Sequence, residues 1–254
     1  MNELHEKTVI VTTSWDDGHP HDLRLSNLLN TFGVKGTYYI PQSNEGMPVV
    51  TKEGIRALKS CGGEIGAHTL THVELPAFGK KRIGEELSGG KKYLEDIIGE
   101  EVTSFCYPRG KFKRDLRYLV ADAGYKLART TFSFNIDNNY DPLYMPTSLQ
   151  FYPHSPYVHT QHAIKELNIK GLYNYLALFH IERDLYKLVT RIFDHVVDHG
   201  GVFHLWGHSW EIEKMQLWSL LEKTLRYISS RNNVQYMSNK EVVDFRTSIS
   251  STRT

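Results

Sequence analysis

Hydrophobic residues recur along the chain in two patterns, and the two patterns alternate. Short apolar runs predict β-strands at residues 9–15, 34–41, 63–68, 103–108, 125–132 and 201–206. Apolar residues three or four positions apart predict helices near residues 20–33, 51–62, 80–98, 114–124, 184–200 and 213–229. A last helix is predicted from Ser238, because Ser238 and Glu241 form a capping-box pattern. Alternating strands and helices predict a parallel sheet covered by helices.

The alternation stops between residues 133 and 160, a polar and aromatic segment rich in Asn, Tyr, Pro and His. Loops of this length in a compact domain are usually functional or disordered, so we interpret this one as a candidate substrate lid. We find no internal repeat and no linker-like composition, and therefore expect a single domain over residues 1–247. The Ser- and Thr-rich residues 248–254 are expected to form a disordered tail. The order of elements favours a distorted (β/α) barrel of about seven parallel strands over a small open sheet.

The composition is that of an ordinary globular protein. Of the 254 residues, 40% are hydrophobic and 23% charged, and a chain of this length can bury one large core. Lys and Arg number 30 against 29 Asp and Glu, a near-neutral balance that argues against a nucleic-acid-binding surface. The first apolar run is too short for a signal-peptide core or a membrane span, so we expect a cytoplasmic protein without membrane insertion. Cys61 and Cys106 are expected to be reduced.

Polar residues follow several of the predicted strands directly. In parallel α/β barrels the chemistry lies at the carboxyl ends of the strands, so residues at these positions are the first candidates for a site. Four groups occupy such positions: Asp16, Asp17 and His19; His68 and His72; Tyr107 to Gly110; and His208. We expect these groups to converge at one end of the barrel.

Two histidines and a pair of aspartates form a candidate metal site. His68 and His72 are four positions apart, which brings both imidazoles to one side of a helical turn. An isolated pair of this spacing is more often satisfied by backbone carbonyls or water, but the Asp16–Asp17 pair changes that balance. Two neutral imidazoles and one carboxylate leave metal positions open for water and substrate, as catalysis requires. A dication also offsets the repulsion between adjacent carboxylates, so that both stay ionised and one is free to accept a proton.

Four segments, TTSWDDG, EIGAHTLTH, FCYPRG and GGVFHLWGHSWE, occur in the order and approximate spacing of the polysaccharide deacetylases, carbohydrate esterase family four. The chain resembles this family over about residues 8–245. The resemblance implies the family's distorted barrel, with Asp16 as general base and Asp17, His68 and His72 as ligands of one divalent metal ion. Zinc fits these nitrogen and oxygen ligands, and cobalt, nickel, iron or manganese are alternatives.

The resemblance also implies further groups for hydrolysis of an acetamide. A backbone N–H from the turn formed by Tyr107, Pro108 and Arg109 would stabilise the oxyanion, and a general acid must protonate the departing amine. We favour His208 as this acid because it follows the last apolar strand, whereas His204 lies within that strand. Both histidines share one face of the strand, so parity does not separate them and His204 stays the alternative.

The third motif departs from the family pattern. Family members usually carry an arginine near its start, where it orients the base, but this chain has Cys106 at that position. Arg109 and Arg129 are the two candidates to supply the missing charge, and either could equally be a surface residue. The family's fourth motif, an Asp and Trp pair, is not found in this sequence.

Several other residues are candidates for substrate contact. His19 follows the aspartates directly, and His154 lies in the long polar segment. Trp210 and Tyr107 offer surfaces for stacking on a sugar ring, and we expect Trp206 to pack in the core instead. Glu211 is expected either to brace His208 or to begin the following helix.

These residues predict a metal-dependent hydrolase that removes an acetyl group from an N-acetylated sugar or saccharide precursor, in glycan biosynthesis. One alternative is hydrolysis of another amide on the same scaffold, such as a cyclic imide or a ureide. A second alternative is a catalytically silent saccharide-binding protein, for which the missing third-motif arginine is the argument. The presence of both aspartates and both histidines argues against the silent protein.

Overall fold

Eight parallel strands form the centre of the molecule in a computed structural model that describes residues 8–251. The strands are β1 (Val9–Trp15), β2 (Gly36–Ile40), β3 (Glu64–Ala67), β4 (Ser104–Cys106), β5 (Leu127–Arg129), β6 (Leu149–Gln150), β7 (Gly201–Gly207) and β8 (Val234–Tyr236). Their order across the sheet is β5-β4-β3-β2-β1-β7-β6, and β8 pairs with β1 at its amino end. This arrangement confirms the predicted distorted (β/α) barrel.

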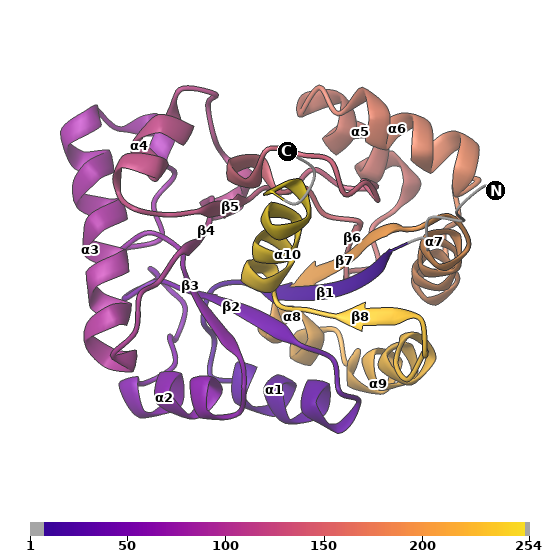
Figure 1. The fold of residues 1–254 in the computed structure, drawn as a ribbon, viewed down its shortest axis with the longest axis horizontal. Coiled ribbons are helices and arrows are strands. Elements are labelled where there is room, and N and C mark those ends of the chain that lie inside the picture. The colour runs from indigo at the N-terminus through magenta and orange to yellow at the C-terminus, as the bar shows by residue number, and fades with distance from the viewer. Residues whose placement is uncertain (1–7, 252–254) are drawn as a thin grey trace.

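Helices surround the sheet on its outer side (Figure 1). They are α1 (Asp22–Thr31), α2 (Lys52–Ser60), α3 (Lys80–Ile98), α4 (Leu116–Asp122), α5 (Pro156–Lys165), α6 (Ile169–Tyr173), α7 (Leu185–His199), α8 (Ser209–Lys214), α9 (Trp218–Ile228) and α10 (Asn239–Ser251). Among the residues described, no helix combines the length and the apolar character needed to cross a bilayer.

A short segment around β6 joins the two ends of the sheet. Met145 N–H donates to the Ala128 carbonyl beside β5, and Ser148 N–H donates to the His204 carbonyl of β7, both at 2.9 Å. Met145, Leu149 and Phe151 are fully buried in this segment. The interpretation of residues 133–160 as one long lid is therefore wrong for this part, which closes the barrel. A two-residue strand is too short to produce a recognisable apolar pattern.

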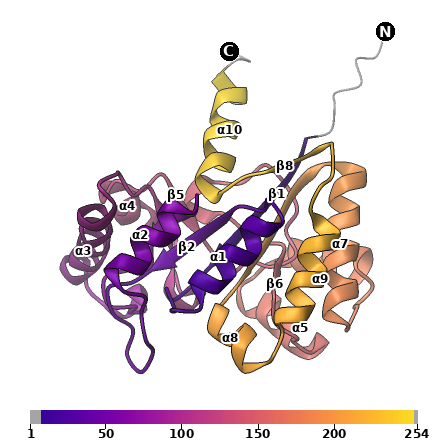
Figure 2. The same ribbon diagram turned by 90° about the horizontal axis from the view of Figure 1, so that it is seen from below.

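Alternate strand residues point into the barrel and form layers along its axis. At the amino ends of the strands, Ile10, Leu127 and Val202 pack with Met145 and with Val242 and Val243 of α10. Figure 2 shows α10 standing at this end of the strands. One step along each strand the interior becomes polar, since Thr12 Oγ1 donates to Asn239 Oδ1 and Ser14 Oγ bonds His204 Nε2, both at 2.8 Å. The next inward positions are at the carboxyl ends, where the candidate catalytic residues lie.

Three helical regions differ from the expected pattern. Helices α5 and α6 follow β6 and were not predicted, because few of their residues are buried and their apolar periodicity is weak. The helix expected at 213–229 is divided into α8 and α9, with Gln216 between them in the left-handed conformation (φ 55°). Helix α10 continues to Ser251, into the predicted tail, and the last part of that tail, 252–254, lies outside the described residues.

Candidate active site

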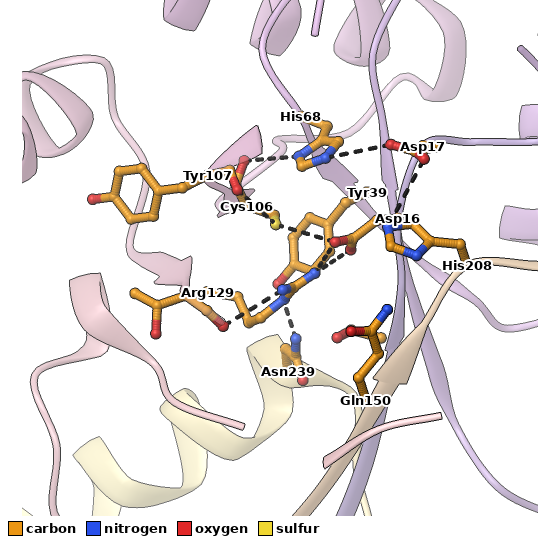
Figure 3. A network of polar contacts seen from close by, with 12 residues as sticks. Asp16, Asp17, Tyr39, His68, Cys106, Tyr107, Arg129, Gln150, His208 and Asn239 are labelled. Carbon is orange, nitrogen blue, oxygen red and sulfur yellow. Dashed lines mark hydrogen bonds and ion pairs between the residues drawn. The ribbon is translucent and has the colours of Figure 1, made fainter. Parts of the chain in front are cut away.

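A tight turn after β1 separates the two adjacent aspartates. Asp17 and Gly18 both adopt the left-handed conformation, with φ of 74° and 59°. A Cβ atom on Gly18 would lie 2.7 Å from Ile40 Cγ2, so a larger residue does not fit without a shift. Because the chain reverses at this point, Asp16 points into the barrel and Asp17 faces the histidines (Figure 3).

Asp17, His68 and His72 lie together at the carboxyl edge of the sheet. Asp17 Oδ1 is 3.0 Å from His72 Nε2 and 3.8 Å from His68 Nε2. The candidate ligand atoms of all three residues lie within 4.8 Å of one another. Ligand atoms around a tetrahedral zinc ion are roughly 3.3–3.5 Å apart, given bonds of about 2.0–2.2 Å. The spacing therefore fits a divalent metal ion.

The protonation state of His68 also fits a metal ligand. Burial lowers the pKa of His68 to about 4, so the imidazole is neutral near pH 7. Its Nδ1 lies 2.9 Å from the Cys106 carbonyl oxygen, which can only accept a hydrogen bond, so Nδ1 carries the proton. Nε2 is left with a lone pair that faces Asp17. A hydrogen bond of this kind to the second ring nitrogen orients a metal-binding histidine.

A second group, Asp16, His68 and Cys106, also lies close enough to hold a metal ion. Two observations argue against it. Both oxygens of Asp16 accept hydrogen bonds from Arg129, and burial raises the pKa of the Cys106 thiol well above its usual value. A protonated thiol is a poor ligand, so the Asp17 group is the better candidate.

The turn that carries His68 and His72 is held by helix α3. Glu86 accepts hydrogen bonds from Leu70 N–H at 3.0 Å, from Thr71 N–H at 2.9 Å and from the Thr71 hydroxyl at 2.8 Å. Thr69 and His72 are in the left-handed conformation, so the two histidines do not lie on a helical turn as their spacing predicted. A buried carboxylate on the neighbouring helix replaces the helical hydrogen bonds and stabilises this turn.

Arg129 supplies the charge that is missing from the third motif. It pairs with Cys106 in the register of β4 and β5, so it lies directly beside the usual arginine position. Its guanidinium is fully buried and donates to both carboxylate oxygens of Asp16 (Figure 3). The ring of Trp206 lies 4.5 Å from the guanidinium carbon, as measured to the ring centre. Arg109, the other candidate, is 68% exposed and pairs with Glu74 at 3.4 Å.

The environment of Asp16 keeps this buried carboxylate ionised. Burial alone raises the pKa of Asp16, but the charge of Arg129, followed by those of His68 and His208, lowers it below its ordinary value. Asp16 is 4% exposed and Arg129 is inaccessible to solvent. The pair therefore places an ionised carboxylate next to Asp17 without making it one of the three clustered metal-ligand candidates.

His208 lies on the opposite side of the aspartates, at the end of β7. Its Nδ1 is 2.7 Å from Glu211 Oε2 and its Nε2 is 3.8 Å from Asp17 Oδ2. Burial opposes a charge on this ring, but the hydrogen bond with Glu211 and the charge of Asp17 raise the pKa of His208 to about 9. His204 differs, because burial lowers its pKa to about 3 and both ring nitrogens have partners inside the barrel. The geometry favours His208 over His204 as a proton donor.

A cavity of about 540 Å³ opens beside these groups. Its lining includes Arg109, His154 and Trp210, and Trp210 Nε1–H donates to Asp17 Oδ2 at 2.9 Å. Tyr107 and Pro108 are buried and do not line it. The ring of Tyr107 packs against Phe105 and Phe112 instead, so it is not placed for stacking on a ligand there.

His19 also lies outside the cavity lining. Its Nδ1 accepts a hydrogen bond from His21 N–H at 3.2 Å, and its ring lies 4.7 Å from that of His21. Trp206, which was expected in the core, is buried but lines the cavity as well as contacting Arg129.

Comparison with known proteins identifies the family. The sequence model of the polysaccharide deacetylases matches residues 2–128, half of the chain, including both aspartates and both histidines of the metal-site candidates. The chain belongs to the polysaccharide deacetylase family. The match ends one position before Arg129, so the residue that pairs with the base candidate lies just outside the conserved description of the family.

The relatives of this polysaccharide deacetylase are distant. YxkH of Bacillus subtilis (strain 168), whose name places it in the same family, is 25% identical over 128 residues, which are 50% of this chain and 45% of YxkH. A Mycobacterium smegmatis structure assigned to the family superposes with a TM-score of 0.62 at 15% identity, over 98% of this chain and 94% of its own. The chitin deacetylase of Colletotrichum lindemuthianum gives a TM-score of 0.59 at 15% identity, over 93% and 89%. These structures share the fold with this chain.

Three residues of this polysaccharide deacetylase site were not singled out from the sequence. Glu86 holds the His68–His72 turn, Gln150 bonds both Glu211 and His154, and His159 lines the cavity. Glu86 offered one signal, because a carboxylate sits on the buried face of an otherwise apolar helix stripe. Gln150 and His159 lie in the strand and helix that the hydrophobic pattern missed.

Proposed function

We propose that this protein is a metal-dependent hydrolase that removes the acetyl group from an N-acetylated sugar. The observation that carries the proposal is the separation of roles between neighbours: Asp17 clusters with two neutral-capable imidazoles, whereas Asp16 is held apart by Arg129. Family membership supports a deacetylase, and the cavity beside these groups is of the size that small-molecule ligands occupy.

Asp17, His68 and His72 would hold the metal ion, with zinc as our first choice among the divalent metals. When bound, such an ion polarises the acetyl carbonyl and makes water a stronger nucleophile. Asp16 stays ionised through Arg129 and accepts the proton of the attacking water as general base. Arg129 orients this carboxylate by binding both of its oxygens.

The later steps need a donor for the oxyanion and a proton for the amine. Of the turn residues 107–109, Tyr107 N–H donates to the Arg129 carbonyl at 3.3 Å and Pro108 has no N–H, which leaves Arg109 N–H for the oxyanion. His208, held by Glu211, donates a proton to the departing amine. Both donors line the same cavity as the candidate metal ligands.

The position of Arg129 removes the main argument for a silent saccharide-binding protein. That argument rested on a missing arginine, and the neighbouring strand provides the guanidinium at the same layer of the barrel. We further propose that the enzyme acts on saccharide precursors in glycan biosynthesis in the cytoplasm. Free Cys61 and Cys106 are compatible with a reducing compartment.

Metal analysis combined with a deacetylation assay tests the proposal. Purified wild type should contain about one divalent metal per chain and release acetate from N-acetylated oligosaccharides. His68→Ala and Asp17→Asn should lose the metal, whereas Asp16→Asn should retain it and lose about two to four orders of magnitude in rate. His199→Ala, an exposed histidine on α7, is the matched control and should behave as wild type.

Two outcomes would contradict the proposal. Full metal content in both His68→Ala and Asp17→Asn would mean that the ion binds elsewhere. Hydrolysis of cyclic imides or ureides, without release of acetate from any N-acetylated sugar, would favour the alternative amide substrate.

A further inference from the structure

The cavity extends from the candidate metal ligands to a group of basic residues at its other end. Besides the catalytic candidates, its lining includes Lys111 after β4, and His162, Lys165 and Glu166 at the end of α5. None of these four residues has a part in the acetyl-transfer chemistry described above. We call Lys111, His162 and Lys165 the basic end of the cavity.

The two lysines of the basic end are not neutralised by the protein. Within residues 8–251, neither Lys111 nor Lys165 forms an ion pair, whereas nearby Arg109 pairs with Glu74 and Lys170 pairs with Asp137. After burial, the charges of Lys165 and Lys111 are what lower the pKa of His162, so the three groups lie near one another. Like charges that gather in a concave site without a counter-ion favour an anionic ligand.

The carboxyl group of Glu166 only partly balances these lysines. Burial raises the pKa of Glu166 to about 7, against the lowering effects of the Thr131 hydroxyl and the Lys111 charge. About half of the molecules therefore carry a neutral carboxyl group at neutral pH, hydrogen-bonded to Thr131 Oγ1 at 2.8 Å. A protonated carboxyl group can itself donate a hydrogen bond to an anion.

Uncharged polar groups connect the two ends of the cavity. Glu211, which holds His208, accepts a hydrogen bond from Gln150 at 3.1 Å, and Gln150 Oε1 lies 2.9 Å from His154 Nε2. The ring of His154 is 5.8 Å from that of His162 at the basic end. Burial lowers the pKa of His154 to about 4, so this middle section is neutral at pH 7 and suits sugar hydroxyl groups.

We propose that the basic end binds an anionic substituent of the substrate, so that the substrate is an N-acetylated sugar carrying a phosphate or a carboxylate away from its acetamide. This inference rests on the proposed function, because it places the acetamide at the candidate metal ligands. Neutral sugar hydroxyls lie along the middle section, and Lys111 and Lys165 form charge-assisted hydrogen bonds to the anion.

Binding measurements in a variant without turnover test this assignment. The host is metal-loaded Asp16→Asn, and calorimetric titration compares N-acetylglucosamine with its 1-phosphate, its 6-phosphate and N-acetylmuramic acid, which carries a carboxylate. We expect at least one anionic sugar to bind about tenfold or more tightly than the neutral sugar. This preference should fall by about fivefold for each of Lys111→Gln and Lys165→Gln and should weaken with added salt. Lys113→Gln, an exposed lysine outside the cavity lining, is the matched control and should retain the preference.

The outcomes separate this inference from the proposed function. Equal binding of neutral and anionic sugars, or a preference that survives both lysine substitutions, overturns the basic end as an anion site even if acetate is released. A lysine-dependent preference in a protein that deacetylates none of these sugars supports the anion site and contradicts the proposed function. The phosphate and carboxylate probes identify which anion the site prefers.

Discussion

Replacing Arg129 with glutamine removes the guanidinium that faces Asp16 inside the barrel while keeping a polar side chain of similar length. The change leaves Asp16 buried, with 4% of its surface exposed, but without the group that does most to oppose the effect of burial on its pKa. Removing one partner of a buried ion pair typically costs about 3–5 kcal/mol of folding free energy. This is a large part of the roughly 5–15 kcal/mol by which domains are stable, so the melting temperature should fall clearly.

The same loss has a kinetic consequence. One unit of pKa corresponds to about 1.4 kcal/mol, so losing this interaction should move the acidic limb of the pH–rate profile upward by at least about one unit. At pH 7 more of Asp16 is then protonated, and we expect kcat/KM to fall by about two orders of magnitude. Part of this activity should return as the pH rises, because the carboxylate ionises again.

The assay is kcat/KM for acetate release between pH 5 and pH 10, together with bound metal and thermal unfolding. Arg129→Lys keeps the charge and should retain an acidic limb near that of wild type. Arg109→Gln alters an exposed arginine of the neighbouring turn and serves as the control for general effects of losing a positive charge near the cavity. An acidic limb in Arg129→Gln that coincides with that of wild type, with metal content unchanged, would refute the role of Arg129 in holding the base ionised.

Three further predictions follow from contacts around the site. Glu86→Ala removes three hydrogen bonds to the His68–His72 turn and should weaken metal affinity by about 10- to 100-fold in a metal titration, whereas exposed Glu85→Ala should not. Glu211→Gln removes the hydrogen bond that raises the pKa of His208, so the basic limb of the pH profile for kcat should move downward by about one unit. In metal-free protein, burial raises the pKa of Asp22 to about 8, so the folded state binds one proton more than the unfolded state from about pH 4 to pH 8 and stability decreases as the pH rises through this window. Asp22→Asn should remove up to about 5 kcal/mol of this decrease, and equal slopes of unfolding free energy against pH in both proteins would contradict it.

Much of the site was predictable because its chemistry is written in short segments at strand ends. Asp16 and Asp17 directly follow the apolar run of β1, and His208 directly follows that of β7. A strand that ends at the barrel rim delivers its next residues to the rim, so position along the chain was enough to group them. The barrel itself followed from alternating hydrophobic periods of the same kind.

The remaining features depend on contacts between distant parts of the chain. Arg129 was one of two candidates, and only the lateral register of β5 on β4 placed it against Asp16. The ring of Tyr107 turns into an aromatic cluster, which no local pattern specifies. Strand β6 is two residues long, so its role in closing the barrel came from its hydrogen bonds to both edges of the sheet.

The side-by-side register of Cys106 and Arg129 means that the guanidinium reaches Asp16 from the next stave of the barrel at an unchanged height. In a closed parallel barrel, every inward-facing residue of one layer has neighbours on both adjoining strands, so a charge can be supplied to the axis from several directions. Two barrels can therefore hold the same electrostatic centre while their aligned sequences differ at the position expected to provide it. The chemical equivalence of such sites is a property of the ring of residues around the axis, and a substitution in one strand is read correctly only together with its neighbours across the sheet.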